Sequence, residues 1–294
     1  MRLISCRTSA GETLGVVAHG RWLSAEELVP GGPRTMAALL DGGATALASL
    51  ATAAASGRVE ADGRPVADVE LLPPVPRPGK VVAIGRNYRE HAAEEGVEPP
   101  AAPLVFAKWP SSVIGHGAEI RWDPMLSDQV DYEAELAVVI GRRARRVPEE
   151  DALEHVLGYT CLNDVSARDL QFGDGQWVRG KSLDTFCPMG PVLVTADELG
   201  DPQQLAIRCT VGDEVLQDDT TASMYFSVAE IISYCSRAFT LEPGDVVATG
   251  TPSGVGVFRK PPRFLRAGDV VGVEIEGIGR LENVCRHDDL GLSA

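Results

Sequence analysis

The pattern of hydrophobic positions predicts many short strands over most of the chain. After residue 80, apolar runs rich in β-branched residues are bounded by glycine, proline or aspartate, which is typical of strands. The clearest runs are 81–84, 136–140, 192–195, 246–249 and 270–275. Helical spacing of apolar residues is rarer, and it predicts helices at 149–157 and 228–235. Together these elements predict an α+β fold that is dominated by strands and has barrel or roll character.

The first 70 residues or so follow a different pattern. Two strand candidates, 3–6 and 14–18, precede an alanine-rich stretch that a pair of glycines interrupts. The run 71–79 contains four prolines within six residues. Because proline cannot donate a ladder hydrogen bond, this run is the best linker candidate. We therefore expect a small β-rich N-terminal domain at 1–72 with a structural role, and a larger domain at 73–294 that carries the chemistry.

Acidic residues exceed basic residues by a wide margin. The chain has 27 lysines and arginines against 42 aspartates and glutamates, which gives a formal net charge of −15. Such a chain repels a phosphate backbone or an anionic membrane surface, so neither nucleic acid nor a membrane is an expected partner. If the substrate is itself a small anion, a cation must be bound locally to hold it.

The cysteines and the lengths of the apolar runs bear on the cellular compartment. The six cysteines are scattered singly without a C-x-x-C pair. They are expected to be reduced core residues, with a thiol nucleophile as the less favoured alternative. The first residues lack an apolar core of signal-peptide length, and no stretch approaches the ~18 apolar residues of a membrane span. The sequence therefore predicts a cytoplasmic protein.

Residues 131–140 place two glutamates on an apolar strand. Residues two apart in a strand share a face, so Glu133 and Glu135 point the same way, about 6.6 Å apart at a rise of ~3.3 Å per residue. Both faces are otherwise largely apolar, and two carboxylates buried together are unstable unless a cation compensates their charge. A divalent metal ion is the economical remedy. The alternative is an exposed strand end, at which the glutamates pair with arginines of the segment 142–146.

A third acidic residue, Asp164, follows the apolar stretch 156–162 at a predicted turn. By itself an aspartate in such a place is more often a cap or a turn residue. With Glu133 and Glu135 it completes an all-oxygen ligand set, which suits Mg²⁺ or Mn²⁺ and leaves positions for water and substrate. No comparable group of histidines or cysteines in the sequence favours zinc.

A histidine lies on a predicted short helix near residue 90. His91 is three residues before Glu94 and four before Glu95, so either carboxylate can meet the imidazole. A histidine oriented by a carboxylate is a common general base for water. Gly96 is a plausible C-cap, and flexible flanks of this kind suit a lid. The alternative is a surface histidine beside acidic residues.

A lysine and a glycine-rich loop complete the candidate chemistry. Lys181 follows a glycine and precedes polar residues, and by themselves these neighbours indicate a solvated side chain. The loop 249–256 crowds glycines and hydroxyl side chains after a predicted strand. Its backbone N–H groups can bind an anion, or it is a tight turn that simply needs glycine.

Five short motifs occur together in one order and resemble the fumarylacetoacetate hydrolase family. They are Gly85-Arg86-Asn87-Tyr88 with His91, Glu133-x-Glu135-Leu136, Asn163-Asp164-Val165-Ser166-Ala167-Arg168-Asp169, Gly180-Lys181-Ser182 and the loop 249–256. The resemblance runs from about residue 80 to about residue 281. It implies a mixed β-sandwich roll of the family's C-terminal type, usually a homodimer. It also implies the small N-terminal domain that many bacterial members carry.

The resemblance further implies roles for individual residues. The implied ligands of Mg²⁺ or Mn²⁺ are Glu133, Glu135 and Asp164. The implied catalytic groups are His91 with Glu94, which activate water on a lid segment, and Lys181, which faces the developing oxyanion. The residues that fall where the family contacts its substrate are Arg86, Gln171 and Thr251.

One departure from the family's pattern narrows the implied function. The large fumarylacetoacetate hydrolases place an aspartate ligand shortly before the histidine, where this chain has Ile84 and Gly85. The match is therefore to the shorter bacterial acylpyruvase and decarboxylase branch. It implies a metal-dependent hydrolase that cleaves a C–C bond in a small anionic 2,4-dioxo acid of the fumarylpyruvate or acetylpyruvate class. The alternatives are an oxaloacetate-type 2-oxo acid decarboxylase, an isomerase or hydratase of a related 2-oxo dienoate, and a catalytically silent member that binds a dicarboxylate.

Overall fold

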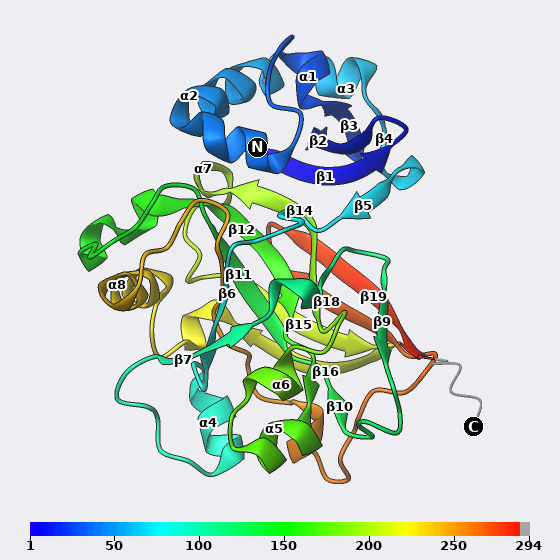
Figure 1. Ribbon diagram of the computed structural model, residues 1–294, viewed down its shortest axis with the longest axis vertical. Helices are drawn as coiled ribbons and strands as arrows, with labels where there is room; N and C mark the ends of the chain where they lie inside the picture. The colour runs from blue at the N-terminus through cyan, green and yellow to red at the C-terminus, as the bar shows by residue number, and fades with distance from the viewer. Residues whose placement is uncertain (289–294) are drawn as a thin grey trace.

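Strands and short helices alternate along residues 1–288, the part of the chain that the computed structural model describes (Figure 1). The strands are β1 (Arg2–Thr8), β2 (Gly11–Ala18), β3 (Arg21–Ser24), β4 (Arg64–Pro65), β5 (Glu70–Leu72), β6 (Val81–Gly85), β7 (Leu104–Lys108), β8 (Val113–Ile114), β9 (Glu119–Trp122), β10 (Val130–Asp131), β11 (Ala134–Ile140), β12 (Val156–Asn163), β13 (Ser166–Ala167), β14 (Cys187–Thr195), β15 (Ala206–Val211), β16 (Glu214–Thr220), β17 (Val246–Ala248), β18 (Val270–Ile275) and β19 (Gly279–His287). The α-helices are α1 (Ala25–Leu28), α2 (Met36–Ala54), α3 (Arg58–Asp62), α4 (Arg89–Glu95), α5 (Arg168–Asp174), α6 (Val178–Lys181), α7 (Ala196–Leu199) and α8 (Val228–Ala238). The 3₁₀ helices are η1 (Val66–Asp68), η2 (Pro110–Ser112), η3 (Glu149–His155), η4 (Thr221–Ser223) and η5 (Gly256–Phe258).

Two large sheets form the framework of these residues. The larger sheet has the order β4-β3-β2-β1-β14-β12-β11-β17-β6-β7, with β5 paired to β1 and β8 paired to β14. The smaller sheet has the order β16-β15-β18-β19-β9, and β10 pairs with β13. Parallel and antiparallel pairs are mixed, since β17 runs parallel to β6 and antiparallel to β11. The predicted strand-rich α+β fold is confirmed.

The predicted strands are found where the apolar runs lie. The runs 81–84, 136–140 and 192–195 fall inside β6, β11 and β14, and 270–275 coincides with β18. The run 246–249 extends one residue beyond β17. The predicted helix 228–235 is the start of α8, whose Ser227 and Glu230 form a capping box.

The helix predicted at 149–157 is wrong at its C-terminal end. It is a 3₁₀ helix that ends at His155, and Val156 begins β12. The apolar run that follows is paired on both sides, because β12 lies between β11 and β14. Burial in the sheet therefore outweighs the helical spacing at this boundary.

Strand β11 is buried on both faces, as its apolar pattern predicts. Leu136, Val138 and Ile140 belong to one hydrophobic cluster, and Ala137 and Val139 belong to a second cluster on the other side. The side chain of a residue in this strand therefore points into one of two cores, whichever face it occupies.

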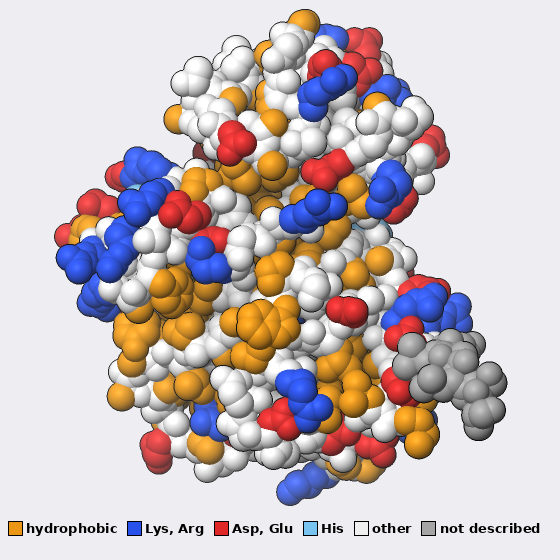
Figure 2. All heavy atoms as spheres, viewed as in Figure 1, with side chains coloured by type: hydrophobic (Ala, Val, Ile, Leu, Met, Phe, Trp, Pro, Cys, Tyr) orange, Lys and Arg blue, Asp and Glu red, His pale blue; other side chains and the backbone are white. Residues whose placement is uncertain are grey.

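The N-terminal segment forms a lobe whose sheet continues into the larger body (Figure 1). Arg2 and Leu3 of β1 pair with Val194 and Leu193 of β14. Figure 2 shows hydrophobic side chains on this face where the lobe meets the body. The boundary between 72 and 73 falls directly after β5 and stays a prediction; residues 289–294 of the proposed second domain lie outside the described residues.

The longest helix has an apolar composition that the sequence pattern did not suggest. By length and composition alone, the 19-residue helix α2 is long and apolar enough to span a membrane. The expectation that no stretch approaches such a span is therefore wrong, because alanines raise the hydropathy of this helix without large side chains. Gly43 interrupts it with non-helical angles, and Met36, Leu39 and Leu50 are buried in a core cluster.

The six cysteines are free and buried. Burial raises the pKa of each thiol, to about 11 at Cys6 and to about 12 at Cys161, Cys187, Cys235 and Cys285; at Cys209 it also raises the pKa. Thiolates are therefore scarce at neutral pH, which argues against a cysteine nucleophile. The prediction of core cysteines is confirmed.

Candidate metal centre and active site

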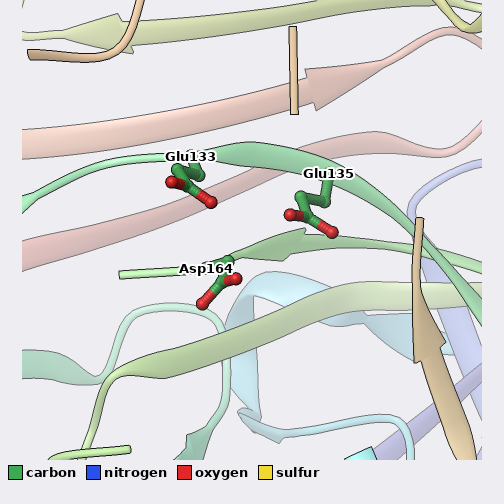
Figure 3. A group of neighbouring side chains, drawn as sticks. All are labelled: Glu133, Glu135 and Asp164. Carbon is green, nitrogen blue, oxygen red and sulfur yellow. The ribbon is translucent and has the colours of Figure 1, made fainter. Parts of the chain in front are cut away.

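Three acidic side chains from neighbouring strand ends meet in the interior (Figure 3). Glu133 immediately precedes β11, Glu135 lies within it, and Asp164 follows β12. The two strands pair with Ala134 opposite Asn163, and the Asp164 N–H donates to the Glu133 carbonyl at 2.9 Å. This register brings the carboxylates together, and one oxygen from each lies within 4.8 Å of those of the other two.

The three carboxylates are at most 4% exposed. The alternative of an exposed strand end is therefore wrong. Arg142 and Arg143 pair instead with Glu154 and Glu242 on the surface. The length of β11 separates these arginines from the two glutamates.

Three buried cations surround the carboxylates. Lys181, at the end of α6, donates from Nζ to Glu133 Oε2 at 2.7 Å and to Asp164 Oδ2 at 2.9 Å. Lys108, at the end of β7, donates to Asp164 Oδ1 at 2.5 Å and to the backbone carbonyl of Lys181. Arg168, the first residue of α5, holds Nη2 2.7 Å from Glu133 Oε1. Lys181 is therefore buried, and the expectation of a solvated side chain is wrong.

The charge around the three carboxylates is unevenly distributed. Burial alone would raise the pKa of Glu133, but the charges of Lys181 and Arg168 lower it to about 2. Burial, together with the nearby carboxylates of Asp164 and Glu133, raises the pKa of Glu135 well above its ordinary value. Lys181 offsets this rise only in part, so Glu135 is short of compensating positive charge, which a divalent cation would supply. Three buried carboxylates, one of them short of a counter-charge, fit a hard cation such as Mg²⁺ or Mn²⁺.

The imidazole of His91 lies between two carboxylates of its own helix, α4. Its Nδ1 is 3.2 Å from Glu94 Oε2, and its Nε2 is 3.2 Å from Glu95 Oε1. The residue is 5% exposed, so it is not the surface histidine of the alternative interpretation. Burial alone would lower its pKa, but the hydrogen bonds to Glu94 and Glu95 raise the pKa to about 9. In this conformation the ring is protonated at neutral pH and is a proton donor.

The glycine-rich loop 249–256 donates backbone N–H groups to carboxylates of the site. The donors and acceptors are Gly250 to Glu135 Oε2 (2.8 Å), Gly254 to Glu94 Oε1 (3.0 Å) and Gly256 to Asp131 Oδ1 (2.7 Å). Gly254 has φ +102°, and a Cβ there would lie 2.2 Å from the carbonyl oxygen of Leu216. The loop is thus a tight turn that requires glycine, and the anions it binds are the protein's own side chains.

A small cavity of about 20 Å³ lies between α4 and the carboxylates, with room for about one water molecule. The charged residues that line it are Arg86, His91, Glu95, Glu133, Glu135, Arg168 and Lys181. Gln171 and Thr251 line it too. Gln171 accepts a hydrogen bond from Arg168 Nη1 at 2.9 Å, and the Thr251 hydroxyl accepts one from Gln217 at 2.8 Å. Seven of the nine residues singled out in the sequence therefore line this cavity. The other two, Glu94 and Asp164, contact the lining residues His91 and Lys181.

Arg86 forms the outer wall of this cavity. Its backbone has φ +57°, which is uncommon for a residue other than glycine. Its Nε donates to Glu95 Oε2 at 2.8 Å, and its guanidinium lies over the ring of Trp177, 5.6 Å from the centroid. Two different contacts therefore hold this cation at the cavity.

Four charged residues of the site were not assigned a role from the sequence. Lys108 and Asp131 belong to no motif that assigned them a role. A lysine at the end of an apolar run, such as Lys108, could have indicated a buried charge that needs a partner. Arg168 lies inside the quoted run 163–169, and it also donates from Nε to Asp131 Oδ2 at 2.9 Å. Glu95 was noted as an alternative partner of His91. The contacts of Lys108 with Asp164 and of Asp131 with Arg168 join elements far apart in the sequence, so they depend on folding. Glu95 instead contacts residues of its own helix and of the turn before it.

Comparison with known proteins adds independent observations. A family model described as "Fumarylacetoacetate (FAA) hydrolase C-terminal" matches residues 80–286. The chain is 43% identical over 289 residues to "Oxaloacetate tautomerase FAHD2A, mitochondrial" of Bos taurus, and the match covers 96% of this chain and 91% of that protein. Two solved structures are similar over 98% of this chain and 100% of their own. They are fumarylacetoacetate hydrolase from Exiguobacterium antarcticum (TM-score 0.84, 37% identity) and maleylpyruvate hydrolase from Sphingobium sp. SYK-6 in complex with manganese (II) ion and pyruvate (TM-score 0.79, 30% identity).

Proposed function

The chain belongs to the fumarylacetoacetate hydrolase family, and from that premise we propose that it is a divalent-metal-dependent tautomerase. Its substrates are the enol and keto forms of oxaloacetate-class 2-oxo dicarboxylates. The observation that carries the proposal is the position of His91 between Glu94 and Glu95, which makes it a proton donor at the cavity. The identity with a tautomerase over nearly the whole chain supports the same reaction.

The proposed ion site consists of Glu133, Glu135 and Asp164. When bound, Mg²⁺ or Mn²⁺ supplies positive charge and Lewis-acid polarisation for an anionic 2-oxo acid. Manganese with pyruvate in the related maleylpyruvate hydrolase supports this choice of ion. This site also answers the question of how a chain with a net charge of −15 holds an anion.

The protein's own residues bind, orient and protonate the substrate. Lys181 and Arg168 add positive charge beside the proposed ion site, and Gln171 and Thr251 offer polar contacts. Ketonisation needs one proton delivered to C3 and one proton removed from the enol hydroxyl. The protonated His91 provides the first, and the proton that leaves the hydroxyl restores the imidazole, so the cycle needs no co-reactant.

Hydrolysis of acylpyruvates is the second candidate. The contact of His91 with Glu94 favours it, because a carboxylate-oriented histidine can activate water. The similarity to maleylpyruvate hydrolase favours it as well. Hydrolysis requires an unprotonated imidazole, however. Burial alone would lower the pKa of His91, but the hydrogen bonds to Glu94 and Glu95 raise it to about 9, which favours a proton donor. We therefore rank tautomerisation first.

The test compares three reactions of the same Mg²⁺-loaded protein. The enol absorbance of oxaloacetate reports tautomerisation, a coupled pyruvate assay reports decarboxylation, and the loss of acetylpyruvate reports hydrolysis. We expect tautomerisation to be fastest, and we expect His91→Gln to slow it at least a hundredfold while Glu90→Gln, on the exposed face of the same helix, does not. Faster acetylpyruvate cleavage would favour the hydrolase, and faster pyruvate release would favour a decarboxylase.

A further inference from the structure

The carboxylate of Glu95 contacts two cations that line the cavity, Arg86 and His91. Glu95 places Oε2 2.8 Å from Arg86 Nε and Oε1 3.2 Å from His91 Nε2. Its side chain lines the cavity and is 14% exposed. It is the last residue of α4, and Gly96 in the left-handed conformation follows it. Glu95 is thus held by two charged contacts where the helix ends.

The other two cations that line the cavity, Lys181 and Arg168, already contact carboxylates of the protein. Lys181 donates to Glu133 and Asp164, both of which are proposed ion ligands. Arg168 is shared by Asp131, Glu133 and Gln171. A substrate with two carboxylates can place one near the ion and Lys181, but the other needs a cation farther out. Among the residues lining this cavity, that leaves Arg86 and His91, and Glu95 already contacts both.

We propose that Glu95 is a specificity-determining gate, an internal carboxylate that occupies the position of the substrate's distal carboxylate until a dicarboxylate displaces it. This inference rests on the proposed class of substrate. A distal carboxylate on Arg86 replaces one of the two charge contacts that Glu95 loses, the ion pair with Arg86. A monocarboxylate offers no replacement and leaves Glu95 in place. Displacement also frees His91 Nε2, so the proton donor is exposed when the correct ligand is bound.

The cavity volume agrees with this gate. About 20 Å³ holds a water molecule but not a four-carbon acid, so a residue of the wall must move for substrate to enter. Glu95 is suited to move, because it lies at a helix end and its side chain reaches solvent. Lys181 and Arg168, which are buried in the site, each contact two or more other side chains and are less suited to move.

The experiment measures binding before turnover. Trp177 lies beside Arg86, so rapid-mixing tryptophan fluorescence is used to titrate the Mg²⁺-loaded protein with oxaloacetate and with 2-oxobutyrate, which carries a methyl group in place of the distal carboxylate. We expect Glu95→Gln to bind oxaloacetate about tenfold more tightly and to bind 2-oxobutyrate within twofold of the unchanged protein. Glu90→Gln is the matched control for loss of one negative charge from α4, and it should alter neither affinity.

A double variant tests whether the tighter binding of oxaloacetate depends on Arg86. In an Arg86→Gln background, Glu95→Gln should no longer tighten the binding of oxaloacetate, because no cation remains for the distal carboxylate. Equal tightening of both ligands by Glu95→Gln would overturn the proposal in favour of a general charge effect. Weaker binding of both would overturn it in favour of a purely structural role. Since binding is read without turnover, a protein that discriminates the ligands but does not tautomerise them would refute the proposed function alone.

Discussion

Lys181 donates from Nζ to Oε2 of Glu133 at 2.7 Å, and both side chains are buried. The lysine therefore belongs to the charge balance of the carboxylate site rather than to the surface. Removal of one partner of a buried ion pair costs more stability than the pair itself contributes, because the remaining charge stays desolvated. This relationship gives the first prediction.

Replacement of Lys181 by methionine should impair both stability and activity. Glu133 and Asp164 each lose a hydrogen-bonded cation, which costs on the order of 3 kcal/mol for a buried pair. Chemical unfolding of the metal-free protein measures this loss. Added Mn²⁺ should recover part of it, whereas turnover should stay at least a hundredfold lower. Unchanged stability of the metal-free variant would contradict the structure at this position.

The stability of the protein should depend on the guanidinium group of Arg168 and not only on its charge. It donates to Asp131 and Gln171 and lies 2.7 Å from Glu133 Oε1, contacts that use the planar fork of a guanidinium. Arg168→Lys keeps the charge but not the fork, so we expect a loss of about 1–3 kcal/mol in stability. Arg266→Lys on the exposed surface is the control. Equal unfolding curves for the two variants would show that charge alone suffices.

The pH dependence of the unfolding free energy should reflect the raised pKa of His91. Its pKa is raised from an ordinary 6.5 to about 9 in the folded protein. The folded state therefore binds a proton more tightly than the unfolded chain does. The resulting stabilisation is fully present below pH 6.5 and disappears as the pH rises through about 9. It is on the order of 3 kcal/mol.

Unfolding of the metal-free protein at several pH values checks this sign. The difference in unfolding free energy between the unchanged protein and His91→Gln should shrink between pH 6 and pH 9.5. A difference that grows over this range would mean that the buried imidazole is neutral in the fold.

The N-terminal lobe should unfold together with the body. Leu3 is fully buried and pairs with Leu193 across the junction between β1 and β14. Leu3→Ala removes core contacts and should cost about 2–5 kcal/mol. Urea unfolding followed by far-ultraviolet circular dichroism should give one transition at a lower urea concentration. Two separate transitions, of which only one moves, would identify the lobe as an independent folding unit.

The sequence predicted the strands and the pair of glutamates from local patterns, whereas the meeting of Asp164 with that pair depends on the pairing of β11 with β12. The alternation in 133–139 placed Glu133 and Glu135 on one face, and the five motifs indicated the family, which is confirmed together with the α+β fold. The 3₁₀ helix that ends at His155 was not predictable, since pairing with two strands distant in sequence decides where β12 begins. The domain boundary after residue 72 and the homodimer stay predictions.

The contacts of the site were less accessible from the sequence. Lys108 reaches Asp164 only because β7 is folded against the segment after β12, and no local pattern indicates that meeting. The choice between a solvated and a buried Lys181 likewise depends on tertiary packing. Charged residues in apolar segments were the available signal of a buried site. They indicate which residues need a partner of opposite charge, but not which residue that partner is.

The central claim is that the buried carboxylates of Glu133, Glu135 and Asp164 bind one divalent ion. Calorimetric titration of the metal-free protein with Mn²⁺ tests it directly, with Glu135→Gln as the variant and Glu12→Gln, on the exposed N-terminal lobe, as the control. We predict one ion per chain, release of protons on binding because the pKa of Glu135 is raised, and at least a hundredfold weaker binding in Glu135→Gln only. Equal Mn²⁺ affinity in all three proteins, or no binding at all, would contradict the account.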